Sequence, residues 1–150
     1  MTEPVTLRPV RVDDLDAFFG HQQEPEAVRR ANFAARDREA FLAHWTGRIL
    51  GDDTVTARTV LAGEQIAGNV VSWWQDGHRE VGYWLGQAFW GRSIGTSAVR
   101  QFLEIEKTRP LYGTTDVGNL ASRRLLEGCG FTFVETVDAG EKKYDLSVLR

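Results

Sequence analysis

The chain has 150 residues, which is the usual length of one domain, so we expect residues 1–150 to form a single domain. Charged residues make up 26% and hydrophobic residues 42%, as in ordinary globular proteins, which excludes a disordered or fibrous chain. The formal net charge of −3 excludes a strongly basic nucleic-acid-binding domain, and the single cysteine excludes an internal disulfide and a cysteine-based zinc site.

The first third of the chain is predicted to form a short strand followed by three helices. The strand spans residues 6–9. Asp13 suits the N-cap of the first helix, and we expect residues 20–23, which begin with a glycine, to break it. Pro25 suits the first turn of a second helix, and Asp37 suits the N-cap of a third, whose apolar residues recur at helical spacing.

The remaining elements begin with a three-stranded meander that contains a hairpin turn at Asp76-Gly77. In chain order we expect strands 54–61, 66–74 and 80–85, loop 86–93, helix 94–107, strand 111–117, helix 119–129, and strands 131–137 and 143–149. The segment from Glu80 to Val117 should form a parallel right-handed crossover. This order predicts an α+β, or mixed α/β, domain of three layers.

A glycine-bearing loop leads from the third meander strand into the next helix and is suited to binding phosphate. A helix N-terminus presents unpaired backbone N–H groups and a partial positive charge, which together bind anions. Gly91 and Gly95 would let the backbone approach a ligand closely, Arg92 adds a charge, and Ser93 and Thr96 add hydroxyl donors. A pyrophosphate fits such a loop, although the loop matches neither the Walker A pattern nor the dinucleotide fingerprint. The alternative is a plain strand-to-helix connection with a serine or threonine cap.

A second polar block lies one strand further along the chain. Asn119 and Ser122 fall in the first turn of a predicted helix, whose apolar face includes Leu125 and Leu126. The alternative to a ligand contact is helix capping by Asn119, which would stabilise the helix by about 1 kcal/mol and involve no chemistry.

The two blocks together resemble the GNAT superfamily of N-acetyltransferases. Gly82-Tyr83-Trp84-Leu85, Phe89-Trp90-Gly91-Arg92 and Asn119-x-x-Ser122 are similar to its RimJ/RimL-like branch, which contains the ribosomal-protein alanine acetyltransferases. The resemblance implies the GNAT (acyl-CoA N-acyltransferase) fold, with a central, mostly antiparallel sheet, a parallel crossover between the fourth and fifth strands, and a splayed cofactor cleft. Trp90 stands where the general family pattern has Gln or Arg, and Ser93 replaces the middle glycine.

The resemblance also implies an acetyl-CoA-dependent N-acetyltransferase that acts on a primary amine by direct attack in a ternary complex. The acceptor would be a protein N-terminus or a small-molecule amine. The backbone amide of Leu85 or a neighbour would polarise the thioester carbonyl. The residues expected to bind acetyl-CoA are Tyr83, Trp84, Leu85, Trp90, Gly91, Arg92, Ser93, Ile94, Gly95, Thr96, Asn119 and Ser122.

Two residues are predicted to carry catalysis. Glu80, at the start of a strand, would act as the general base directly or through water, with His78 as the rival. Many family members place a tyrosine as the acid four positions after the serine of the second block, where this chain has Leu126. Ser122 is therefore predicted to protonate or hydrogen-bond the leaving thiolate.

Several further expectations concern the setting of this chemistry. The sequence shows no metal-binding cluster, no membrane span and no signal peptide, and we expect a cytoplasmic protein. No nucleic-acid partner is expected, and a homodimer is left open. The acceptor site is expected around residues 21–35 and the last hairpin. An acetyl-CoA-binding sensor or interaction module that has lost catalysis is the alternative function.

Overall fold

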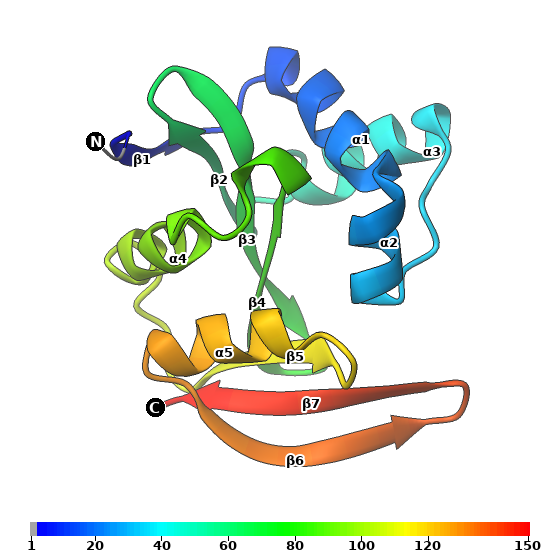
Figure 1. Ribbon diagram of the computed structural model, residues 1–150, viewed down its shortest axis with the longest axis vertical. Helices are drawn as coiled ribbons and strands as arrows, with labels where there is room; N and C mark the ends of the chain where they lie inside the picture. Colours follow the sequence, from blue (N-terminus) through cyan, green and yellow to red (C-terminus); the bar gives the residue numbers. More distant parts are fainter. Residues whose placement is uncertain (1–2) are drawn as a thin grey trace.

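The computed structural model of this chain describes residues 3–150, and a seven-stranded sheet forms its centre (Figure 1). The strands are β1 (Val5–Pro9), β2 (Thr56–Ala62), β3 (Gln65–Gln75), β4 (His78–Leu85), β5 (Leu111–Asp116), β6 (Thr132–Ala139) and β7 (Lys142–Leu149). Their order across the sheet is β1-β2-β3-β4-β5-β7-β6. Every neighbouring pair is antiparallel except β4 and β5, which are parallel, as the crossover prediction requires.

The helices cover both faces of this sheet. They are α1 (Leu15–Gln23), α2 (Pro25–Ala31), α3 (Arg38–Ala43), α4 (Ile94–Leu103) and α5 (Leu120–Gly128), and α3 continues into a π-helical turn, η2 (His44–Ile49). Figure 1 shows α4 and the group α1–α3 on opposite sides of β3 and β4. The three-layer α+β prediction is therefore confirmed.

Each face of the sheet has its own apolar cluster. Phe102 of α4 and Leu126 of α5 pack with Val70 and Val81 against one face, and all four side chains are buried. On the other face, Phe18 of α1, together with Phe41, Trp45 and Leu15, packs against Val71 of β3. Alternate residues of one strand face opposite sides, so β3 and β4 contribute side chains to both layers.

Only the first part of β4 pairs with β5. The paired positions are Arg79 with Leu111, Glu80 with Tyr112 and Val81 with Gly113. Beyond this point the end of β4 pairs only with β3, and the end of β5 pairs only with β7. The two strands therefore separate, which confirms the splayed cleft.

A buried ion pair fixes the start of β4, next to the splay. Arg79 Nε donates to Glu106 Oε1 at 2.7 Å, and both side chains are only 5% exposed. Ser72 Oγ of β3 also donates to Glu106 Oε1, at 2.6 Å. Removing one partner of such a buried pair leaves an uncompensated charge, so this cluster holds β3, β4 and the end of the α4 segment together.

Three of the predicted helix boundaries are wrong. The first helix does not break at residues 20–23, because α1 runs through Gly20 to Gln23. Its end packs on β4: Trp84 Nε1 donates to His21 O at 3.1 Å, and a Cβ on Gly86 would lie 2.7 Å from the His21 ring. This tertiary contact outweighs the low helix propensity of one glycine.

The helix expected at residues 94–107 ends at Leu103, because Glu106 turns inward to Arg79. Asp13 is likewise not the cap of the first helix. Its neighbour Asp14 accepts from the Arg11 backbone N–H at 2.8 Å and pairs with Arg8 at 2.7 Å. Asp37 does cap α3, since its Oδ1 accepts from Ala40 N at 2.8 Å.

Candidate active site

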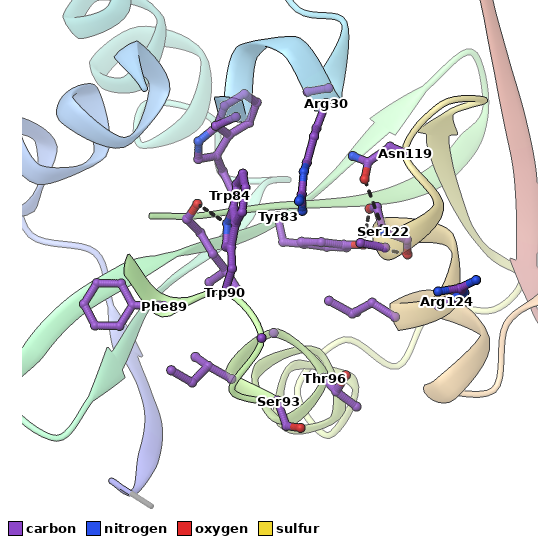
Figure 2. A pocket seen from close by; sticks show the side chains of 18 residues that line it. Arg30, Tyr83, Trp84, Phe89, Trp90, Ser93, Thr96, Asn119, Ser122 and Arg124 are labelled. Carbon is purple, nitrogen blue, oxygen red and sulfur yellow. Dashed lines mark hydrogen bonds between the residues drawn. The ribbon is translucent and has the colours of Figure 1, made fainter. Parts of the chain in front are cut away.

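A cavity of about 520 Å³ opens where β4 leaves β5 (Figure 2). Its walls come from the end of β4, the start of α4, the start of α5 and one face of α2. Eleven of the twelve residues predicted to bind acetyl-CoA line it, namely Tyr83, Trp84, Leu85, Trp90, Gly91, Ser93, Ile94, Gly95, Thr96, Asn119 and Ser122. Segments far apart in the sequence therefore meet at one site.

The N-terminus of α4 faces this cavity without a side-chain cap. Ser93 occupies the N-cap position, but its hydroxyl makes no capping hydrogen bond. The capped strand-to-helix connection considered as an alternative is therefore not what the loop forms. The first-turn N–H groups of α4 remain available for an anion, with the helix dipole behind them. The site residues present thus fit a pyrophosphate.

The backbone of the loop turns through two left-handed residues. Gly91 has φ of 72° and Ser93 has φ of 60°. A non-glycine residue tolerates the left-handed region at a cost of roughly 1–2 kcal/mol, so Ser93 can replace the middle glycine of the family pattern. The replacement changes the strain of the loop and leaves its path compatible with an anion site.

Gly95 has a packing role that the sequence did not suggest. A Cβ there would lie 2.6 Å from Leu125 Cδ1 of α5 and 3.0 Å from Leu85 Cδ1 of β4. The absence of a side chain lets α4 pack closely against α5 and β4, which is a packing requirement. Gly95 also lines the cavity, so its close approach to a ligand stays a prediction.

The free edge of β4 presents a backbone amide to the cleft. Gly86 N donates to Ala67 O of β3 at 2.8 Å, whereas Leu85 O accepts from Trp90 Nε1 at 3.1 Å on the other side. In an extended strand the N–H and C=O of one residue point to the same side. The Leu85 N–H therefore points toward the gap left by β5, as a donor to a thioester oxygen would have to.

Tyr83 reaches across the cleft from β4 to α5. Its hydroxyl is hydrogen-bonded to Ser122 Oγ and donates to Ser122 O at 3.0 Å, and Figure 2 shows its ring pointing at Ser122. Burial raises the pKa of Tyr83 to about 12, although the Ser122 hydrogen bond opposes this shift. The Tyr83 hydroxyl thus stays protonated at neutral pH. Sequence reasoning placed Tyr83 among the ligand-binding residues and did not predict its hydrogen bonds to Ser122.

Two arginines that the sequence analysis did not select also line the cavity. Arg30 points into it from α2, with its guanidinium 4.3 Å from the centroid of the Trp90 ring, and Arg124 lies on α5 (Figure 2). Arg124 follows Ser122 by two positions, so the second motif could have indicated it. Arg30 lies about sixty residues before the loop, and no local pattern links it to the site. Both bring a guanidinium to the wall of the cavity, and that of Arg30 is also paired with Glu26 at 3.3 Å.

Two predicted ligand-binding residues, Asn119 and Arg92, differ in how they relate to the cavity. Asn119 caps α5, because its Oδ1 accepts from Ser122 N at 3.3 Å, and it lines the cavity at the same time. The cap is therefore present, and the contact of Asn119 with a ligand stays a prediction. Arg92 does not line the cavity: its guanidinium contacts Ala88 O and Glu3. Its side chain as a phosphate ligand stays a prediction.

Glu80 lines neither this cavity nor the second one described below. It is half-buried, in the paired part of β4, opposite Trp73 of β3 and Tyr112 of β5. Burial raises the pKa of its carboxyl, with His78 opposing and Asp76 adding to the shift. Strand alternation places Glu80 on the same face as Gly82 and Trp84.

A second cavity, of about 940 Å³, lies on the face of the sheet that carries Gly82 and Trp84. It shares Tyr83 and Trp84 with the first cavity, so the two meet at the end of β4. Of residues 21–35, where the acceptor was expected, residue 22 lines it, and residue 36 lies one position beyond that range; no residue of the last hairpin lines it. Thus two cavities converge on one strand, an arrangement that suits two substrates.

Within residues 3–150 no helix is long and apolar enough to cross a bilayer. In the same part of the chain, no three His, Cys, Asp or Glu side chains are grouped as metal ligands.

Comparison with protein families matches residues 5–132 to the family described as "Acetyltransferase (GNAT) domain". Curated proteins gave no match. Among solved structures, the aminoglycoside acetyltransferase AAC(6')-Ib in complex with coenzyme A and kanamycin is 20% identical, with a TM-score of 0.81 over 97% of this chain and 94% of that one. The identity is low, so this likeness concerns the fold.

Two further structures are similar at the level of the fold. RimL, the ribosomal L7/L12 α-N-protein acetyltransferase, in complex with coenzyme A, is 16% identical, with a TM-score of 0.82 over 99% of this chain and 97% of that one. Spermidine N-acetyltransferase from Vibrio cholerae, in complex with CoA and spermine, is 14% identical, with a TM-score of 0.80 over 97% of this chain and 94% of that one.

Proposed function

Because the chain belongs to the GNAT acetyltransferase family, we propose that it transfers the acetyl group of acetyl-CoA to a primary amine, with both substrates bound together in a ternary complex. One observation carries the proposal: the splay of β4 from β5 and the uncapped start of α4 open into the same cavity. The splay leaves a backbone donor for a carbonyl oxygen, and the helix start offers donors for phosphate.

Acetyl-CoA would supply the thioester, and the chain's own groups would bind and orient it. The start of α4, with Arg30 and Arg124 nearby, would hold the pyrophosphate. The Leu85 N–H would donate to the carbonyl oxygen, where negative charge develops during the reaction. Asn119 would contact the connecting arm along the free edge of β4.

Two proton movements have to accompany transfer to an amine. The ammonium form must lose a proton before it attacks, and the departing sulfur must gain one. Glu80 would accept the first proton through water, because its carboxylate is on the acceptor face of β4 but outside the cavity lining. Tyr83 and Ser122, joined by their hydrogen bond, would supply the second.

The finer assignment is to the RimJ/RimL-like branch, with a protein N-terminus or a small amine as acceptor and the cytoplasm as location. The segments Gly82-Tyr83-Trp84-Leu85 and Phe89-Trp90-Gly91-Arg92 support the branch. The cavity on the second face of the sheet supports an acceptor that enters opposite acetyl-CoA.

The test is incubation with acetyl-CoA and a panel of amines and peptides, with release of free thiol as the readout. Turnover on at least one amine is expected. Gly91→Val serves as the matched variant, because a β-branched residue at φ of 72° is strained and should weaken acetyl-CoA binding by about tenfold. Tight acetyl-CoA binding without turnover on any acceptor would mean a sensor instead, and no measurable affinity at millimolar acetyl-CoA would overturn the proposal.

A further inference from the structure

The second cavity meets the first at Tyr83 and Trp84, so this is the end at which an acceptor amine would reach the thioester. Six residues of the two central strands line the cavity here, namely Asn69, Val71 and Trp73 of β3 and Gly82, Tyr83 and Trp84 of β4. None of these side chains is charged, and three of them are aromatic. The strands therefore present an uncharged wall, rich in aromatic surface, next to the reacting nitrogen.

The Trp73 side chain reaches diagonally from β3 to β4. In the strand register Trp73 lies opposite Glu80, and Gly82 lies opposite Val71. A Cβ on Gly82 would nevertheless meet the Trp73 ring, at 2.9 Å from Cη2 and 3.1 Å from Cζ3. Both atoms belong to the benzo edge, which is the end of an indole farthest from its own backbone. The tip of the Trp73 ring thus rests on the Gly82 backbone, a diagonal contact that only a long aromatic side chain makes.

This tip lies close to the reactive end of the cavity. Gly82 and Trp84 face the same side of β4 and are two residues apart, which corresponds to about 7 Å of strand. Glu80 is on the same face, beyond Gly82. The Trp73 ring therefore covers the sheet between Glu80 and Trp84, which accounts for the absence of Glu80 from the lining of either cavity.

The two tryptophans that border this space are held by their own neighbours. Trp73 packs against a buried cluster in which the Phe18 and Trp45 rings lie 4.9 Å apart between centroids. The Trp84 ring contacts the Phe33 ring at 5.5 Å between centroids. Closely packed rings move only at the expense of their other contacts, so the room between Trp73 and Trp84 is set by the fold.

From this geometry we propose that Trp73 determines which amines the site accepts, because its benzo edge limits the bulk beside the reacting nitrogen. The acceptor is a primary amine with an apolar, unbranched carbon next to the nitrogen. A branch there would need the space that the Trp73 ring fills, and Gly82 is the counterpart that lets the ring lie so low. The inference rests on the proposed transfer to an amine and deepens it.

The proposal also separates the two classes of acceptor. The α-carbon of a protein N-terminus is branched at every residue except glycine, whereas many small amines carry their nitrogen on a CH₂ group. A site that rejects a branch at this carbon therefore favours a small amine.

The first test compares benzylamine with both enantiomers of α-methylbenzylamine, which differ from it by one methyl group on the carbon that bears the nitrogen. Release of CoA thiol is the readout. A kcat/KM at least tenfold higher for benzylamine is expected, because one methyl group in a closely fitting apolar pocket changes kcat/KM by about 10- to 200-fold. An equal kcat/KM for either enantiomer, or turnover of branched amines alone, would overturn the proposal.

The variant Trp73→Phe tests whether this residue is responsible. Phenylalanine keeps an aromatic ring but lacks the benzo edge, so kcat/KM for α-methylbenzylamine should rise by about tenfold, with little change for benzylamine. Trp74→Phe is the matched control: Trp74 also borders the cavity, but it is 50% exposed and pairs with Arg79, about 17 Å of strand from the pair of Trp84. It should leave the ratio of the two amines unchanged. Unchanged discrimination in Trp73→Phe would overturn the proposal.

The variant Gly82→Ala tests the contact from the other strand. Its Cβ would displace the Trp73 ring toward the cavity, so kcat/KM for benzylamine should fall by about tenfold. In the double variant Gly82→Ala/Trp73→Phe the shorter ring leaves room for the methyl group, and activity should recover. Urea unfolding shows whether each protein is folded. Additive losses in folded proteins would mean that this contact does not shape the site.

A binding measurement separates this inference from the proposed function. N-acetylbenzylamine and N-acetyl-α-methylbenzylamine are titrated against the tryptophan fluorescence of the protein in the presence of CoA. Tighter binding of the unbranched amide, with the difference lost in Trp73→Phe, supports the role of Trp73 even if no transfer is detected. Equal binding of the two amides, in a protein that does acetylate amines, overturns the inference and leaves the proposed function intact.

Discussion

The Tyr83 hydroxyl of β4 donates to the backbone oxygen of Ser122 on α5 at 3.0 Å and is also hydrogen-bonded to the Ser122 hydroxyl. Leu126 stands where many family members have a tyrosine as the acid. A phenol is nonetheless present at the cleft, and it comes from the facing strand. Burial keeps it protonated, with a pKa of about 12.

Removal of this phenol should slow the transfer step. Tyr83→Phe and Ser122→Ala are each expected to lower kcat by about 10- to 100-fold, because a positioned proton donor contributes at least this much to group transfer. Tyr144→Phe, on β7, is the control and should keep its kcat. Steady-state thiol release measures the effect, and unchanged kcat in both variants would remove this pair from the mechanism.

A base at Glu80 should produce an acid limb in the pH profile. Burial raises the pKa of the Glu80 carboxyl, and a base must be ionised, so kcat/KM should fall as pH drops through this raised pKa. Glu80→Gln should lower kcat/KM by about 10- to 100-fold and abolish the limb. If His78→Gln abolishes the limb and Glu80→Gln retains it, the base is the histidine.

The left-handed backbone at Ser93 should be measurable as strain. Ser93→Gly is expected to stabilise the fold by about 1 kcal/mol, because glycine adopts φ of 60° at no steric cost. Ser93→Val should destabilise it by a similar amount or more and raise the KM for acetyl-CoA. Urea unfolding of the three proteins gives the free energies. If Ser93→Gly is less stable than the unchanged protein, the backbone at Ser93 is not strained.

The Asp14 cluster should make stability depend on pH. Burial opposes ionisation, but hydrogen bonds from Arg8, the Arg11 backbone and Thr59 lower the pKa of Asp14 from 3.8 to about 2. Because the pKa of Asp14 is lower in the folded state, its ionised carboxylate stabilises the folded protein at pH values above its unfolded-state pKa. This stabilisation is lost as the pH falls through the folded-state pKa. The contribution at pH 7 is therefore about 2 kcal/mol, and it disappears between about pH 4 and pH 2.

Asp14→Asn tests this dependence. The variant should lose about 2 kcal/mol or more at pH 7 and show a flatter stability profile in acid, as measured by urea unfolding at several pH values. Asp13→Asn is the matched control, because Asp13 is the adjacent, exposed carboxylate and should leave the profile unchanged. If Asp13→Asn has the larger effect, Asp13 rather than Asp14 caps this helix, as the sequence suggested.

The sequence by itself determined the order of the elements and predicted an anion site at the start of α4. Alternating apolar residues predict the strands, and a glycine-bearing loop before a helix predicts the phosphate site, because strand alternation and helix dipoles are local properties. The resemblance of Gly82–Leu85 and Asn119–Ser122 to a family added the splay and the ligand class. Errors at Gly20 and at the end of α4 arose where tertiary contacts outweighed local propensity.

Only the tertiary structure decided which distant side chains share a site. Tyr83 meets Ser122, 39 positions away, and Arg30 joins the same cavity, because two strands separate and α2 lies beside the gap. Gly95 serves packing because Leu125 and Leu85 occupy the space at its Cβ position. Contact, burial and charge pairing depend on residues far apart in the chain, and no local pattern encodes them.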